Sequence, residues 1–316
     1  MNTADNKDKV CSHSEIEFVK MHGIANDYVY VYDTGNNLPE NISRLSVAVS
    51  HRHCGVGGDG LVVISRSAMK SVEFRMRIFN ADGSEAQMCG NASRCVGKYL
   101  YEKGFTDKTT IHLETLAGVK VLYLDIDEYN NKVRNVRVDM GAPEFAPEFI
   151  PVLDTLPTSD AQMRMACVDI DGEKFCLNLV SMGNPHAICF TDSDPTDEQV
   201  LGAGPKIERH PYWPERTNVE FARILDRHLI RMRVWERGSG ETMACGTGAC
   251  ATAVAAMSLG LADSPVTVRL TGGDLTIEWD RPSGHVFMSG GATTVAEGIY
   301  HYESERDNIW MHPRQQ

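Results

Sequence analysis

An internal repeat is the feature that most constrains how this 316-residue chain can fold. When the sequence is shifted by 156 residues, RMRIFNADGSEAQMCG (75–90) lies over RMRVWERGSGETMACG (231–246), with six identities in sixteen positions. In each copy an alternating segment leads into a Gly-containing loop, a Cys-Gly pair and a run of small residues. The upstream segments are more weakly similar, with Asn26 63 residues before Cys89 and Asn184 61 residues before Cys245. We therefore predict two copies of one unit, related by pseudo-two-fold symmetry.

Hydrophobic alternation predicts a mixed α and β fold in which strands dominate. In 72–79 and 229–235, apolar side chains face one way and charged side chains the other, which is typical of strands with one buried face. The predicted strands are 28–32, 61–65, 72–79, 110–114, 133–140, 174–180, 187–190, 229–235, 266–270 and 275–279, and the predicted helices are 42–52, 90–103, 196–209 and 247–259.

A Pro-rich stretch without regular period, 141–157, is the best candidate for a boundary between the halves. We expect a first half at 1–143 that carries Cys89, and a second half at 144–292 that carries Cys245. The remaining segment, 293–316, is expected to return to the first half.

Charge and hydropathy exclude several classes of protein. The chain has 31 Lys and Arg against 43 Asp and Glu, a net charge of −12, which is the wrong balance for neutralising the phosphates of a nucleic acid. Its longest uncharged run of small and apolar residues, 249–262, is too short to span a bilayer. The segment 1–10 has the pattern of neither a secretion signal nor a transit peptide, and we interpret it as a short flexible tail. We expect a cytoplasmic protein with a small-molecule partner, without nucleic acid or membrane.

Cysteine usage also indicates a reducing compartment. Nine cysteines are an odd number, and without a secretion signal they favour reduced thiols over a disulfide framework. Most buried cysteines behave as small, inert hydrophobic residues. We expect that of Cys11, Cys54, Cys95, Cys167, Cys176, Cys189 and Cys250.

Cys89 and Cys245 differ, because the repeat places each of them just before a predicted helix. There the helix dipole and free N–H groups are expected to lower the thiol pKa from about 8.5 towards neutrality. Two such thiols on opposite faces of an α-carbon can invert it, since one removes the proton and the other supplies a proton. A bell-shaped pH dependence would then belong to the pair. The N–H groups expected to hold the substrate carboxylate are those of Gly90, Asn91, Gly246 and Thr247.

Other chemistries have weaker support. The gaps from Cys89 to Cys95 and from Cys245 to Cys250 differ from those of structural zinc sites. No lysine stands in a recognisable pyridoxal phosphate context. The segment GVGGDG, 55–60, follows a predicted helix instead of a strand, so we interpret it as a tight turn and not as a dinucleotide loop. We expect neither a metal nor a cofactor.

Six sequence blocks resemble the diaminopimelate epimerase family. They are KMHGIANDY (20–28), CGVGGDGL (54–61), FNADGSEAQMCGNASRC (79–95), GNPHA (183–187), ERTNVEF (215–221) and ERGSGETMACGTGAC (236–250). The resemblance implies two similar α/β halves, each with a curved, barrel-like, mostly antiparallel sheet around a central helix. It also implies a cofactor-independent isomerase that interconverts L,L- and meso-diaminopimelate in lysine and peptidoglycan precursor synthesis, and a homodimer is typical of the family.

The resemblance also assigns roles to residues. It makes Cys89 and Cys245 the two acid/base groups and places His186 and Glu236 beside them as assisting groups. The distal amino acid end of the substrate would contact Asn80, Asn184, Asn218, Glu236 and Arg237, with Asn26 also lining the site. Without the resemblance, plainer interpretations stay open for several of them. Asn80 and Asn184 fit turns, Glu236 with Arg237 fits an exposed ion pair, and His186 fits a buried core histidine. Glu85 and Glu241, which the repeat also matches, are expected to be structural.

Three departures from the family pattern bear on the site. Ala25 and Ala92 stand where glycine is usual, and either would add strain of about 1 kcal/mol if its backbone required a positive φ. Gly60 stands where some relatives carry a glutamine. A histidine or proline-type racemase, a PhzF-like isomerase and a non-catalytic binding protein are the alternatives. The distal-end residues argue against the racemases, and the presence of both cysteines argues against the other two.

Overall fold

The computed structural model describes residues 13–153, 156–157 and 164–303. In its first half, strands come before, between and after two helices. The elements are β1 (His13–Gly23), β2 (Asn26–Tyr32), α1 (Ile42–Ser50), β3 (Gly60–Arg66), β4 (Phe74–Asn80), β5 (Glu85–Ala86), α2 (Gly90–Glu102), β6 (Thr110–Thr115), β7 (Gly118–Asp127) and β8 (Lys132–Gly141).

The second half repeats that order after a short 3₁₀ turn, η1 (Pro147–Phe149), and a two-residue strand, β9 (Leu156–Pro157). Its elements are β10 (Arg164–Ile170), β11 (Glu173–Ser181), β12 (Pro185–Phe190), the π-helical turn η2 (Glu198–Ala203), α3 (Gly204–Glu208), β13 (Asn218–Asp226), β14 (Leu229–Glu236), β15 (Gly240–Thr242), α4 (Gly246–Ser258), β16 (Val266–Leu270), β17 (Gly273–Trp279) and β18 (Val286–Gly290). A long last strand, β19 (Thr293–Glu303), follows.

Strand pairing joins the two halves into one curved sheet that does not close within the described residues. The first ladder runs β19-β1-β2-β3-β4-β6-β7-β8, and the second runs β10-β11-β12-β13-β14-β16-β17-β18. Antiparallel pairing of β8 with β18 connects them. The exceptions to antiparallel pairing within the ladders occur at matching places, β2/β3 with β12/β13, and β4/β6 with β14/β16. This agrees with the predicted fold class.

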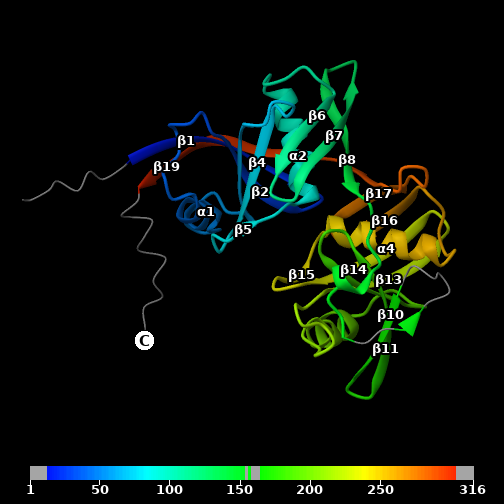
Figure 1. Cartoon of the computed structure of the whole chain (residues 1–316). Helices are drawn as coiled ribbons and strands as arrows, with labels where there is room; N and C mark the ends of the chain where they lie inside the picture. Colours follow the sequence, from blue (N-terminus) through cyan, green and yellow to red (C-terminus); the bar gives the residue numbers. More distant parts are fainter. Residues whose placement is uncertain (1–12, 154–155, 158–163, 304–316) are drawn as a thin grey trace, which may run out of the picture.

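Each ladder curves around one helix (Figure 1). Helix α2 packs on β1, β2, β7 and β8, and α4 packs on β11 to β14 and on β16 to β18. Helix α4 is buried on every side from Gly248 to Met257, as expected for a helix of small and apolar residues in the centre of a core. No helix in the described part of the chain is long and apolar enough to cross a membrane.

The predicted elements are present with one change, and several strands were missed. Instead of one helix at 196–209, the chain forms η2 followed by the short α3. The missed strands are β1, β7, β10, β13, β18 and β19, together with the short strands β5, β9 and β15. Two of these strands lack the expected apolar alternation. Strand β19 is exposed over its first seven residues, and β13 contains the buried Glu220 among apolar neighbours.

The prediction of inert, separate thiols is wrong for one pair of cysteines. Cys167 on β10 and Cys176 on β11 form a disulfide. The two strands make a tight hairpin, and its register sets these residues directly opposite each other with a Cα–Cα distance of 4.2 Å. The flexible tail predicted at 1–10 lies outside the described residues, as does the end of the segment expected to return, 304–316.

Candidate active site

The two repeat-matched cysteines occupy equivalent positions at the starts of the two central helices. Cys89 is the N-cap residue of α2 with φ −141°, and Cys245 is the N-cap residue of α4 with φ −120°. An extended residue before the first helical turn has the helix N–H groups ahead of it. Both thiols therefore lie at the positive ends of helices, as the repeat predicts.

A matching hairpin leads into each cysteine and is held by a matching ion pair. Arg77 binds Glu85 between β4 and β5, with an Nε–Oε1 distance of 2.7 Å. Arg233 binds Glu241 between β14 and β15, with an Nε–Oε1 distance of 2.8 Å. The structural role predicted for the two glutamates is therefore confirmed.

The starts of α2 and α4 pack against each other at the junction of the halves. A Cβ placed on Gly90 would lie 2.6 Å from Cε of Met288, and one on Gly246 would lie 3.0 Å from Sδ of the same methionine, so both helix starts pack against this side chain. Asn91 of α2 donates from Nδ2 to the carbonyl of Ala244, the residue before Cys245, at 3.3 Å. These contacts bring the two thiol-bearing segments together at one interface.

Cys89 is partly exposed and lies next to Asn26, with Sγ 3.5 Å from Oδ1. Burial of the sulfur raises the pKa of this thiol, while the N–H groups of Ala92 and Asn91 oppose the rise. Glu236 raises the pKa further, and the Arg94 guanidinium lowers it. The net shift is upward, opposite to the predicted lowering, because desolvation of a thiolate outweighs a few N–H donors.

Cys245 is buried and receives the N–H of Gly248 at 3.4 Å, while the hydroxyl of Thr247 lies 3.6 Å from its Sγ. Burial raises the pKa of this thiol well above its usual range, and the carboxylates of Glu236 and Glu220 raise it further. The predicted lowering is wrong here too. The main cause is burial of the sulfur, and the two acidic side chains that it faces add to the rise.

Glu236 lies at the end of β14 and acts on both thiols electrostatically. Its carboxylate accepts a hydrogen bond from the Thr242 hydroxyl, and burial raises its pKa. A carboxyl group with a raised pKa beside a thiol can exchange a proton with it. Within the described ranges, no group of three or more His, Cys, Asp and Glu side chains could hold a metal ion.

His186 is fully buried and bonded at both ring nitrogens. Nδ1 lies 2.6 Å from Oε1 of Glu220, and Nε2 lies 3.1 Å from Oδ1 of Asn184. Sequence reasoning missed Glu220. Its signal is an acidic residue within the otherwise apolar stretch Val219–Ala222 of β13, which needs a buried partner.

The predicted distal-end residues are tied to the backbone around them. Asn218 donates from Nδ2 to the Pro185 carbonyl at 2.8 Å and accepts the Arg237 N–H on Oδ1 at 2.9 Å. The exposed Arg237 donates from Nη1 to the Glu215 carbonyl at 3.1 Å, so its side chain is directed away from an ion pair with its neighbour Glu236. Asn80 instead donates to the Ser84 hydroxyl at 3.0 Å within its own turn.

Arg94 is a second residue that sequence reasoning missed. It is fully buried on α2 and donates to Oδ1 of Asn91 at 3.0 Å and to the Gly291 carbonyl at 3.3 Å. Its Nη2 has no hydrogen-bond partner among the described residues. Burial lowers the pKa of this guanidinium. The signal in the sequence is an arginine among the small residues of a predicted helix. A charge that becomes buried there requires hydrogen-bond or ion-pair partners.

The three departures from the family pattern have different structural outcomes. Ala25 has φ +67° in the turn between β1 and β2, a conformation that suits glycine, whereas Ala92 lies inside α2 without such strain. Gly60 has no room for a side chain here, because a Cβ would lie 2.0 Å from the Phe79 carbonyl oxygen.

Solved structures with similar folds include epimerases, a probable proline racemase, an isomerase and PhzF-family phenazine biosynthesis proteins. A hydroxyproline epimerase from Agrobacterium vitis superposes with a TM-score of 0.65 at 14% identity, over 93% of this chain and 94% of that chain. A PhzF-family phenazine biosynthesis protein from Bacillus anthracis gives 0.61 at 17% identity, over 90% and 99%. At such low identity the likeness shows the fold alone.

Sequence comparison is more specific. The family model described as diaminopimelate epimerase matches residues 18–146 and 178–295. Diaminopimelate epimerases of Acetivibrio thermocellus and Methanococcus maripaludis are 49% and 50% identical to the chain over 287 residues, covering 90% of it and 98% and 99% of the relatives. One from Phocaeicola vulgatus is 50% identical over 283 residues, covering 90% and 97%. The chain therefore belongs to the diaminopimelate epimerase family of isomerases.

Proposed function

We propose that the protein interconverts L,L- and meso-diaminopimelate without a cofactor, by proton transfer between the substrate α-carbon and the thiols of Cys89 and Cys245. The observation that carries the proposal is the equivalent placement of the two thiols at helix starts that meet across the junction of the halves. Membership of the family supports the substrate.

The helix starts also provide a receptor for the reacting carboxylate. Its N–H donors would be those of Gly90, Asn91, Gly246 and Thr247. With the carboxylate held there, one thiolate takes the α-proton from one face and becomes a thiol. The opposite thiol gives its proton to the other face and becomes a thiolate. The α-carbon is inverted, and the next turnover of the same isomer requires that the two sulfurs exchange their protonation states.

Because the pKa values of both thiols are raised, the reaction needs a group that helps to form a thiolate in the site. Glu236 is positioned to take a proton from Cys245, with which it interacts directly. His186 acts less directly, through Asn184 and the buried Glu220. Because these groups are coupled, kcat/KM should show one bell-shaped pH profile that belongs to the set.

The distal amino acid end of the substrate would be held by residues from both halves of the molecule. A guanidinium suits a carboxylate, and amide and carboxylate oxygens suit an ammonium group. Arg237 is the best single candidate for this selection, since Asn218 fixes its backbone. The other proposed contacts are Asn26, Asn80, Asn184 and Glu236.

The wider setting follows from this activity. We place the reaction in the cytoplasm, on the route to lysine, with a homodimer as the working form. The halves 1–143 and 144–292 would act as domains that close over the substrate and expel water from it. Water exclusion strengthens each electrostatic interaction in the site.

Proton NMR of the reduced protein with L,L-diaminopimelate in D₂O, without pyridoxal phosphate, tests the proposal. We expect loss of the α-proton signal with formation of the meso isomer. Parallel reactions with L-histidine, L-proline and trans-4-hydroxy-L-proline test the alternative racemases. If one of these exchanges and diaminopimelate does not, the two-thiol chemistry stands and the assignment of Arg237 and the asparagines is wrong. If none exchanges, the proposed function is wrong.

A further inference from the structure

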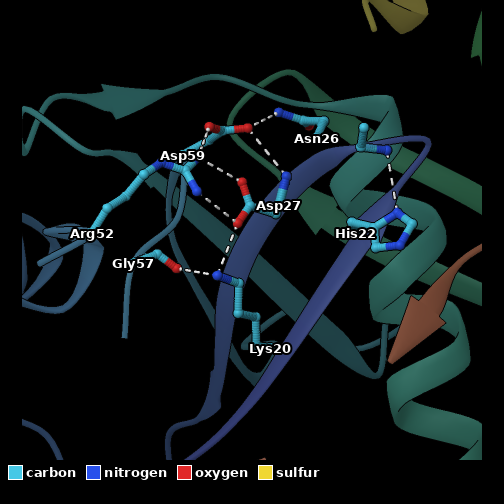
Figure 2. A network of polar contacts seen from close by, with 8 residues as sticks. Lys20, His22, Asn26, Asp27, Arg52, Gly57 and Asp59 are labelled. Atoms are coloured by element: carbon cyan, nitrogen blue, oxygen red, sulfur yellow. Dashed lines mark hydrogen bonds and ion pairs between the residues drawn. The ribbon is translucent and has the colours of Figure 1, made fainter. Parts of the chain in front are cut away.

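The GVGGDG segment, interpreted from sequence as a tight turn, brings one carboxylate beside the site. It leads from α1 into β3 and lies against the start of β2 (Figure 2). The approach is close, because a Cβ on Gly58 would lie 3.0 Å from the Asp27 carbonyl oxygen. The Asp59 N–H donates to that same carbonyl at 2.6 Å. The segment therefore holds Asp59 at a fixed place next to β2.

The Asp59 carboxylate is held by three further contacts. Arg52 binds Oδ1 through Nη2 at 2.9 Å, and the Asp27 N–H donates to Oδ2 at 3.1 Å. Oδ2 also accepts from Nδ2 of Asn26 at 2.9 Å (Figure 2). Since an ionised carboxylate only accepts hydrogen bonds, the amide of Asn26 must turn its NH₂ group to Asp59.

This fixes what Asn26 offers to the thiol. With Nδ2 engaged by Asp59, the carbonyl oxygen Oδ1 faces Sγ of Cys89 at 3.5 Å. A carbonyl oxygen accepts from a protonated thiol, but it repels a thiolate. The orientation of one amide therefore favours the protonated form of Cys89.

We propose that Asp59 is a positioning residue for Cys89, which acts by locking the amide of Asn26 so that its oxygen faces the sulfur. The inference rests on the proposed function only in giving Cys89 a part in proton transfer. The other groups that act on this sulfur are Arg94 and the N–H groups of Asn91 and Ala92 from α2, and Glu236 from β14. Burial raises the pKa of the nearby Tyr28 on β2, and the sulfur raises it further. Tyr28 also forms a side-chain hydrogen bond with Asn26. Because a phenol hydroxyl can either donate or accept, that contact does not fix which end of the amide faces the sulfur.

The test measures how fast iodoacetamide alkylates Cys89 between pH 6.5 and 9.5 without substrate, by peptide mass spectrometry, with the exposed Cys54 as internal reference. In Asp59→Asn the amide of Asn26 is free to turn its NH₂ group to the sulfur, which stabilises the thiolate. We expect the rate at pH 8 to rise about three- to tenfold, the worth of one hydrogen bond, with the whole profile shifted to lower pH.

Asp27→Asn is the matched control, because it removes a carboxylate of the same network whose side chain contacts Lys20 and Arg52 but not Asn26. It should leave the Cys89 rate within about twofold of wild type, well below the change expected for one hydrogen bond. In an Asn26→Ala background, Asp59→Asn should have no further effect. An effect that persists there would mean that Asp59 acts through its charge, and the positioning role would be wrong.

An unchanged Cys89 rate in folded Asp59→Asn would also overturn the proposal. Asp59→Ser is the second variant if circular dichroism shows that Asp59→Asn does not fold, and the same rise is expected. The alkylation assay uses no substrate, so it gives its answer even if diaminopimelate is not epimerised. Conversely, epimerisation with an unchanged alkylation rate would leave the proposed function intact and remove only this inference.

Discussion

The two halves share a backbone plan but support their asparagines with different chemistry. In the first half, Asn26 is held by Asp59 at the partly exposed edge of the loop before β3. In the second half, Asn184 is held by His186, which is itself bonded to the fully buried Glu220. The register of the parallel strands shows which residues differ at equivalent positions. Tyr28 opposes Gly60 between β2 and β3, where His186 opposes Asn218 between β12 and β13.

The comparison shows that the two halves share their backbone elements but differ in the charged side chains around their cysteines. The helix starts, the hairpins and the Arg-Glu pairs are the same in both halves. The charges around the sulfurs are not. Cys89 has a buried cation, Arg94, whereas Cys245 faces the carboxylates of Glu236 and Glu220. The proposed site therefore contains two unequal thiols.

Replacing either cysteine is expected to have the largest effect. Cys89→Ala and Cys245→Ala should each reduce epimerisation about 10²- to 10⁴-fold, because each removes one acid/base group. If each half serves one face, each variant should still exchange the α-proton of only one isomer with D₂O, which NMR can follow. Cys250→Ala, which alters a buried free thiol in the same helix as Cys245, is the control and should retain activity. Full epimerisation by either single variant would show that the halves do not share the reaction.

Breaking the buried pair of His186 and Glu220 in the second half is expected to lower the free energy of unfolding. Glu220→Gln leaves His186 without its anionic partner in a site with no solvent exposure, so we expect a loss of about 3 kcal/mol of unfolding free energy. Urea denaturation measures it. Glu241→Gln, which breaks the partly exposed pair with Arg233, should cost less than about 1 kcal/mol. Equal losses in the two variants would contradict this interpretation.

The unequal thiols should also react at different rates. Both pKa values are raised, that of Cys245 further, so the thiolate fraction of each rises with pH and that of Cys89 is larger near pH 8. Iodoacetamide should therefore label Cys89 faster than Cys245, because the thiolate is the reactive form. Glu236→Gln should speed labelling of Cys245 by removing a facing carboxylate. Faster labelling of Cys245 in the wild type would reverse the comparison.

The smallest expected effect concerns the turn that precedes each asparagine. The first half uses Ala25 at φ +67°, where the second half uses Gly183 at φ +91°. Ala25→Gly should raise the unfolding free energy by about 1 kcal/mol, because glycine adopts this conformation without a Cβ clash. Thermal denaturation would show it as a higher Tm. A lower Tm would mean that the alanine methyl group makes contacts worth more than the strain.

Local patterns made much of the fold predictable. The repeat predicted two equivalent halves and the places of both cysteines, since it preserves strand, loop and helix order. The disulfide was also within reach. Asp171 and Gly172 both have positive φ, as in a two-residue hairpin turn, and Cys167 and Cys176 lie four residues from that turn on either side. An odd number of cysteines favours free thiols, which is the opposite of what this local signal predicts.

The supporting residues of the site were not predictable in the same way. Asp59 meets Asn26 across 33 residues of sequence, and His186 meets Glu220 across 34. Both contacts depend on the register of parallel strands, which no local pattern specifies. The thiol pKa shifts failed for a related reason, because the extent to which a sulfur is buried depends on the whole packed interface.

The pairing of β19 with β1 has a consequence for biosynthesis (Figure 1). The ribosome releases β1 first among the described strands and β19 last, with the entire second half between them. Until β19 emerges, one edge of β1 has unpaired N–H and C=O groups, and such an edge is open to other chains. During synthesis, the first half therefore keeps an unpaired sheet edge at β1 until the last strand of its own chain is available.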